Sequence, residues 1–111
     1  MSFAVKLKYE TIRSVNSNTF NAAYAVFGSA LAHSPVIVRF VNDSDKDMNI
    51  STDGTNDMDF IPAGGFALYD LTANKNAGTA LGFPKATQFY VKGASAGTGL
   101  VYAIVLYASE T

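Results

Sequence analysis

The 111-residue sequence has no cysteine, no tryptophan and a single histidine. Without cysteine the chain can form neither disulfides nor thiolate metal sites. One histidine, His33, cannot supply the several imidazoles of a usual histidine metal site. Tryptophan, a common platform for sugar rings, is also missing. We therefore expect no metal centre and no cofactor, and we interpret His33 as a loop residue before Pro35.

Charge is scarce as well. Charged residues make up 15% of the chain, against about 25% in an average soluble domain. The eight basic residues are spread thinly, and the net charge is −1. Binding to a phosphate backbone requires clustered lysine and arginine, so nucleic acid is not an expected partner. The low charge also suggests that something other than water covers part of the surface.

Long apolar runs are absent. No run reaches the roughly 18 residues of a membrane span, and charges interrupt the apolar residues of the first ten positions. We therefore expect no signal peptide, no membrane association, and folding in a cytoplasm. A chain of this length with 49% hydrophobic residues suits one domain with its own core. The predicted domain covers residues 1–111, because we find no linker, repeat or low-complexity segment.

Strand signals dominate what is present. Residues 3–9 alternate between apolar and mostly charged side chains, which is typical of a half-buried strand. Residues 35–41, "PVIVRFV", form an apolar, β-branched run typical of a central strand, and further strands are expected over 65–71 and 87–92. Turn signals separate these strands at intervals of roughly 8–12 residues. The pattern predicts an all-β fold, a jelly-roll-like antiparallel β-sandwich.

Two predicted strands have unusual faces. Arg39 lies on the same face as Ile37 and Val41, where it must extend to water or find a carboxylate. Residues 100–108, "LVYAIVLYA", are apolar on both faces. Such a strand is either central and covered on both sides, or buried against a partner.

Residues 19–32, "TFNAAYAVFGSALA", fit both helical and strand periodicity. We expect strand or irregular coil, because everything around this segment has strand character. Phe20, Tyr24 and Phe27 are either ordinary core or an exposed adhesive patch. Core is favoured, since aromatic side chains are usually buried.

Residues 43–60, "DSDKDMNISTDGTNDMDF", hold six of the nine acidic residues. The pair Asp53–Gly54 is a strong signal for a hairpin turn. The register can be predicted from burial, because a shift of one residue moves every side chain to the opposite face. A loop with an odd number of residues brings apolar side chains together on the buried face, in these pairs: Met48 with Phe60 and Ile50 with Met58.

The predicted register turns Asp57 and Asp59 outward, so the acids form the solvated side of a hairpin. The alternative is a calcium site. The aspartates of residues 43–47 match the first ligand positions of an EF-hand loop, but Met48 replaces the required glycine and Gly54 the final glutamate. A glycosidase pair is disfavoured, because outward aspartates lack the apolar wall that raises a carboxyl pKa.

No catalytic motif is recognisable. The chain lacks the "GxSxG" nucleophile turn. The glycine-rich residues 93–99, "GASAGTG", lack the lysine and hydroxyl residue of a phosphate-binding loop, and no helix signal follows them. We predict that the protein is not an enzyme.

The segment from Val38 to Leu71 resembles small virion proteins of tailed bacteriophages. Those proteins share an apolar strand ending in Asn-Asp, the motifs Ile-Ser-x-Asp-Gly and Ile-Pro-Ala-Gly, and a strand ending in Asp-Leu. The matching elements here are Asn42–Asp43, Ile50–Ser51 with Asp53–Gly54, Ile61–Gly64, and Asp70–Leu71. Residues 72–76 and 87–108 also look like that group.

The small size and single domain resemble most the capsid decoration, or staple, proteins of epsilon-fifteen-like podophages. This resemblance implies a structural protein, a jelly-roll-like β domain on the outside of the phage head that bridges neighbouring capsomers and stabilises the capsid. It implies the major capsid protein as partner, a homodimer on the capsid, and a location in the virion after assembly in the host cytoplasm. Residues 1–34 match less well, and we expect a partly irregular capsid-binding arm there.

Candidate interface residues lie in the strand over 3–9 and the aromatic segment over 20–27. Strand edges and apolar side chains make contact by strand addition and apolar burial. The candidates are Phe3, Val5, Leu7, Tyr9, Phe20, Tyr24 and Phe27.

Two other functions compete with the structural one. A phage tail or head-surface module would bind host glycan, with or without calcium, at a shallow site lined by residues such as Asp57, Asp59 and Tyr69. A small cupin-type enzyme would use the same fold. Cupins surround a metal with several histidines, and this chain has one.

Overall fold

The computed structural model describes residues 6–71, 75–76, 79–80 and 82–109. These residues form strands and one short 3-10 helix, η1 (Ser17–Thr19). No helix in the described ranges has the length and apolar character needed to cross a membrane. The strands are β1 (Lys6–Tyr9), β2 (Arg13–Asn16), β3 (Ala25–Val26), β4 (Ile37–Ser44), β5 (Met48–Ser51), β6 (Asp59–Ile61), β7 (Phe66–Asp70), β8 (Lys75–Asn76), β9 (Thr79–Ala80), β10 (Tyr90–Lys92) and β11 (Gly99–Ser109).

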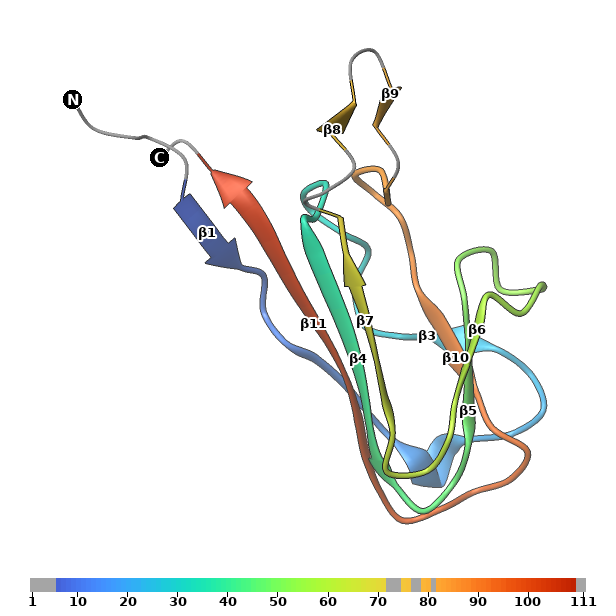
Figure 1. Cartoon of the computed structure of the whole chain (residues 1–111). Coiled ribbons are helices and arrows are strands. Elements are labelled where there is room, and N and C mark those ends of the chain that lie inside the picture. The colour runs from blue at the N-terminus through green and yellow to red at the C-terminus, as the bar shows by residue number, and fades with distance from the viewer. Residues whose placement is uncertain (1–5, 72–74, 77–78, 81, 110–111) are drawn as a thin grey trace.

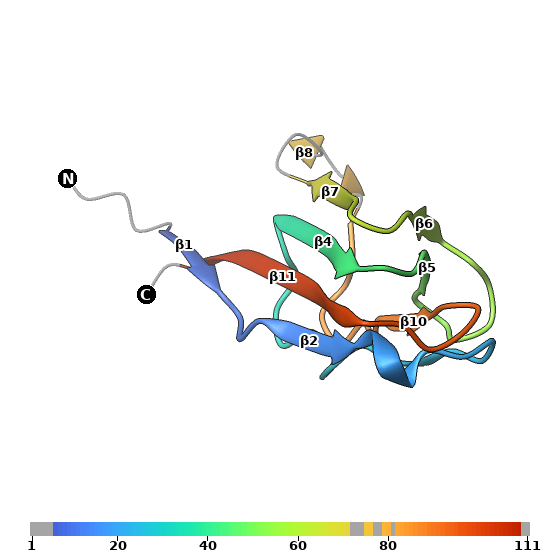
Figure 2. The same cartoon turned by 90° about the horizontal axis from the view of Figure 1, so that it is seen from below.

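Two antiparallel sheets, A and B, pack face to face (Figure 1 and Figure 2). Sheet A has the order β2–β11–β4–β7, and β1 pairs with the last residues of β11 on the β2 side. Sheet B has the order β3–β10–β5–β6. The chain crosses between the sheets at nearly every connection, as it does in an eight-stranded jelly roll. The predicted all-β, jelly-roll-like sandwich is confirmed, as are strands within 35–41, 65–71, 87–92 and 100–108.

The core lies between the sheets and is rich in aromatic rings. The central strands β4 and β11 turn alternate apolar side chains inward, as a period of two requires. Phe40 on β4 is fully buried and lies at the centre of this core. Its ring is 5.0 Å from that of Phe89, 5.9 Å from Phe27 and 6.0 Å from Tyr69, between ring centroids.

The segment before residue 34 belongs to the sandwich over most of its described length. Arg13 and Ser17 are buried, and strands β1 and β2 both pair with β11. Phe20 and Phe27 are 5% and 0% exposed, so the prediction that they are core is confirmed. Their burial removes them from the surface that a partner can contact. Between them the chain is irregular apart from β3, in line with the expected strand or coil.

The predicted register of the acidic hairpin is wrong by one residue. Met58 and Phe60 are exposed, by 36% and 55%, instead of buried. Ile61, a β-branched residue, is buried opposite Met48, in the position where the prediction placed Phe60. The observed pairs are Met48 with Ile61, Asn49 with Phe60 and Ile50 with Asp59.

This register places Asp59 opposite the buried Ile50, so a carboxylate stands beside the core, where a charge without a partner is costly. Strand β6 is the edge of sheet B, so Asp59 is only half-buried. The Tyr69 hydroxyl donates a hydrogen bond to the Asp59 carboxylate. A donor from the facing sheet therefore satisfies the carboxylate, and the penalty for placing it beside the core is offset.

Candidate functional site

The side of sheet A that faces away from sheet B is largely apolar over strands β1, β11, β4 and β7. Directly paired residues point to the same face, so the strand register determines its members. We call this surface the outer face. Its apolar members are Leu7 and Tyr9 on β1, Leu100, Tyr102, Ile104 and Leu106 on β11, Ile37 and Val41 on β4, and Phe66 and Leu68 on β7. The same register adds Arg39 near the centre, Asp43 and Asp70 towards the ends, and Ser14 and Asn16 on the edge strand β2.

Large apolar side chains of the outer face are open to solvent. Tyr9 is 71% exposed and Phe66 68%, and Leu7, Leu68 and Leu100 are exposed as well. From these fractions the outer face presents on the order of 800 Å², about what each partner contributes to a standard protein interface. The largest patch on a typical monomer is roughly 300–600 Å². The outer face is therefore a candidate interface.

Strand β11 illustrates why the sequence pattern was ambiguous. Val101, Ala103 and Val105 face the core and are fully buried, whereas Tyr102 and Ile104 on the other side are only half-buried. No described segment of the chain lies over that outer side. The sequence left two possibilities for this strand: both of its faces are covered by the chain itself, or one face is buried against a partner. Within the described residues, the chain covers only the inner face.

Arg39 carries the only positive charge on the outer face among the described residues, and two acids lie on the same face by register, Asp43 opposite Leu100 and Asp70 opposite Ile37. It is directly paired with Ile104 on one side and Leu68 on the other. Its guanidinium extends into solvent and makes no hydrogen bond or ion pair with the described residues. An apolar hollow of about 270 Å³ lies beside it, lined by Val41, Phe66 and the backbone of residues 64–65.

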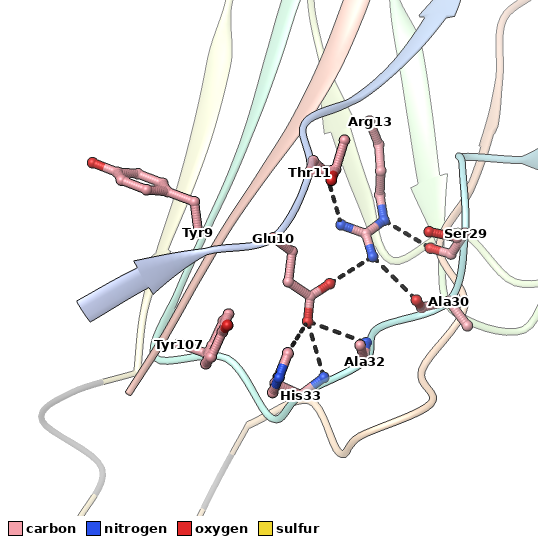
Figure 3. A pocket seen from close by; sticks show the side chains of 9 residues that line it. All are labelled: Tyr9, Glu10, Thr11, Arg13, Ser29, Ala30, Ala32, His33 and Tyr107. Carbon is pink, nitrogen blue, oxygen red and sulfur yellow. Dashed lines mark hydrogen bonds and ion pairs between the residues drawn. The ribbon is translucent and has the colours of Figure 1, made fainter. Parts of the chain in front are cut away.

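A second feature lies where the chain bends between β1 and β2 (Figure 3). The Glu10 carboxylate accepts hydrogen bonds from Arg13 Nη2 at 2.7 Å and from the backbone N–H groups of Ala32 and His33 at 3.1 and 2.9 Å. Arg13 also donates from Nε to the Ser29 carbonyl oxygen at 2.7 Å. Both charged side chains are nearly fully buried. We call this arrangement the Glu10–Arg13 clamp.

The clamp borders an open hollow of about 300 Å³. His33 Nδ1 lies 2.9 Å from Glu10 Oε2, and the His33 ring stacks on Tyr107 with centroids 3.6 Å apart. A carboxylate that orients an imidazole is also part of hydrolytic triads. Within the described chain, however, no hydroxyl group hydrogen-bonds to His33. We therefore interpret the clamp as structural: it ties the bend after β1 to the loop before β4.

The clamp predicts a pH dependence of stability. Burial raises the pKa of Glu10, but hydrogen bonds from Arg13 and His33 and the charge of Arg13 outweigh it, so this pKa lies below its usual value. A carboxyl group whose pKa is lower in the folded state stabilises the fold above its unfolded pKa of about 4.3. That contribution is lost as the pH falls towards the folded pKa.

We expect the stability gap between the wild type and the Glu10→Gln variant to be widest at pH 7 and to narrow between about pH 5 and pH 3. Urea unfolding of both proteins across this range measures the gap. The other carboxyl groups contribute equally to both proteins and cancel in the difference. A constant gap over the whole range would show that ionised Glu10 does not stabilise the fold.

Asp53 forms a local turn in the acidic stretch, whereas Asp45 and Asp47 accept hydrogen bonds from the distant backbone N–H groups of Thr98 and Ala63. Asp53 accepts hydrogen bonds from the backbone N–H groups of Asn56 and Thr55, which hold its pKa well below the usual range. Gly54 adopts a φ of 77°, the left-handed region that suits glycine in a turn. The predicted turn at Asp53–Gly54 is thus confirmed. No three acidic or histidine side chains within the described residues converge in a way that could hold a metal ion.

Asp57 and Asp59 are engaged by different tyrosines. The Tyr24 hydroxyl donates to Asp57, whose carboxylate also lies 3.4 Å from the Lys92 ammonium group. Burial and then the hydrogen bond to Asp57 raise the pKa of Tyr24. Asp59 bonds to Tyr69 instead. The residues proposed for a glycan site are therefore divided between two separate interactions.

The candidate interface residues from the sequence fall into four groups, of which the first, Phe20 and Phe27, is buried in the core. Leu7 and Tyr9 lie on the outer face, and Tyr24 is half-buried against Asp57. Phe3 and Val5 lie outside the described residues. The outer-face residues of β4, β7 and β11 were missing from that set. Their signal in the sequence was the double apolar face of residues 100–108 and an arginine on an apolar strand.

Protein-family models, curated proteins and solved structures give no match to this chain. A function proposed for it therefore rests on its surface geometry and on the motifs of its sequence.

Proposed function

We propose that this protein is a non-enzymatic structural protein of a phage virion, which decorates the outside of the head, bridges neighbouring capsomers and stabilises the capsid. The observation that supports this proposal most strongly is the exposed outer face. An apolar surface on the order of 800 Å² is of the size that a protein partner covers. The motifs of residues 38–71 suggest which partner: the major capsid protein.

A decoration protein needs neither a catalytic pocket nor a cofactor. It binds the assembled shell and not the separated subunits, and so stabilises the shell by mass action. In the proposed homodimer, each unit presents two outer faces. Once the first face is bound, the second binds at a high effective concentration, which raises the avidity without any new kind of contact.

The test uses particles of the phage that encodes this chain. We expect the protein in many copies per purified head, on its outside when imaged by electron microscopy. Heads assembled without it should release their DNA at a temperature several degrees lower, because the shell loses the stabilisation that binding provides. Adding the purified protein back should restore the original temperature. Purified particles without the protein, from cells that express it, would refute the proposal.

A further inference from the structure

The outer face has an unsatisfied cation near its centre, and this identifies the chemistry of its partner. The nearest neighbours of Arg39 are apolar, with Ile104 and Leu68 across the sheet and Ile37 and Val41 along its own strand. Asp70 lies diagonally on β7 but forms no ion pair with Arg39. Among the described residues its guanidinium has no hydrogen-bond or ion-pair partner. Water hydrates it as long as the face is uncovered.

Covering the outer face removes that water. A guanidinium buried without a counter-charge is strongly unfavourable, whereas a carboxylate compensates through two parallel hydrogen bonds. We infer that Arg39 is the specificity anchor of the outer face, and that the surface docking on it presents an Asp or Glu carboxylate flanked by apolar side chains. This inference rests on the proposed function, in which the docking surface belongs to the capsid shell.

The hollow beside Arg39 accounts for the apolar part of that partner. Phe66 and Val41 form its sides, and residues 64–65 form the rest. Gly64 contributes only backbone to the lining of the hollow, and no atom lies within 4 Å of where its side chain would begin. An aliphatic or aromatic side chain next to the carboxylate can enter the hollow while the carboxylate bonds to Arg39. Such pairing of a buried arginine with an apolar pocket is typical of interface hot spots.

A second copy of the chain fits this anchor less well. Two outer faces stacked centre on centre bring Arg39 against an apolar, arginine-bearing surface. Asp43 on the same strand lies about 13 Å away, at 3.3 Å per residue, near the end of the face. Asp70 is closer, diagonal to Arg39 at roughly 7–8 Å across the β4–β7 pair, but it already takes part in another interaction within the chain. The partner that best satisfies Arg39 is therefore a different protein surface with an acid at its centre.

The experiment measures binding of the purified full chain to heads that lack it, by co-sedimentation. We expect Arg39→Glu to weaken binding at least about 30-fold, because it places like charges together in a desolvated contact. Arg39→Lys should weaken binding less, since lysine keeps the positive charge but cannot form the two parallel hydrogen bonds to a carboxylate. Lys85→Glu makes the same charge change at an exposed site away from the outer face, and should bind as the wild type does. Unchanged urea midpoints would show that the variants are folded.

The outcomes separate the inference from the proposed function. If the wild type does not bind the heads, the proposed function is contradicted, and the inference with it. If the wild type binds and Arg39→Glu binds equally well, the function stands and the inference is wrong. Loss of self-association in Arg39→Glu, with head binding intact, would assign the outer face to the homodimer and also overturn the inference. Restored binding of Arg39→Glu to shells in which one exterior acid is changed to lysine would identify the partner residue.

Discussion

Replacing Phe40 with alanine is expected to destabilise the fold by about 3–5 kcal/mol. The Phe40 side chain is fully buried on the central strand β4. Its ring meets those of Phe89 and Tyr69 edge to face, at interplanar angles of 88° and 82°. Alanine would lose the burial of the ring and these aromatic contacts, and would leave a cavity that strands of both sheets cannot close. Domains have total stabilities of only about 5–15 kcal/mol, so a large fraction would be lost.

Urea unfolding at pH 7 measures this effect, and Phe60→Ala is the matched control. Phe60 is more than half exposed on the edge strand β6, so its loss should cost less than about 1 kcal/mol. The comparison also tests the corrected hairpin register. In the register predicted from the sequence, Phe60 would be buried opposite Met48 and its replacement would be costly. Equal losses in the two variants would contradict the observed register.

Replacing Arg13 with alanine is expected to cost about 3–5 kcal/mol, the range for breaking a buried ion pair from one side. The Glu10 carboxylate would stay buried but lose its counter-charge. The carbonyl oxygens of Ser29 and Ala30 would lose their donors, at distances of 2.7 and 3.1 Å in the intact protein. The tie between the β1–β2 bend and the loop before β4 would then be broken.

Arg39→Ala is the matched control for this prediction, because it removes the same side chain from an exposed site. We expect it to change the free energy of unfolding by no more than about 0.5 kcal/mol. A double-mutant cycle with Glu10→Gln should give a coupling free energy of about 1–3 kcal/mol between Arg13 and Glu10. A coupling near zero would mean that the two side chains stabilise the fold independently and that the clamp is not a unit.

The stronger local patterns of the sequence were sufficient for the architecture. The β-branched run of residues 35–41 and the apolar run of residues 100–108 became the two central strands, β4 and β11. The turn at Asp53–Gly54 forms as expected, because the hydrogen bonds that hold it join Asp53 to residues only two and three positions further along the chain. The hairpin register, in contrast, was not determined by neighbouring residues alone. It depended on Tyr69, a residue of the other sheet that satisfies Asp59.

The Glu10–Arg13 clamp and the outer face could be recognised only in the tertiary structure. Glu10 reaches the backbone of residues 32–33, more than 20 positions away, and no pattern near Glu10 indicates that contact. The sequence by itself determined that Arg39 shares a strand face with apolar residues, because side chains alternate along a strand. Only the pairing of β4 with β7 and β11 placed Leu68 and Ile104 around Arg39 and left that side uncovered. Strand order depends on contacts between residues far apart in the chain, and therefore the extent of the outer face was decided by the tertiary structure.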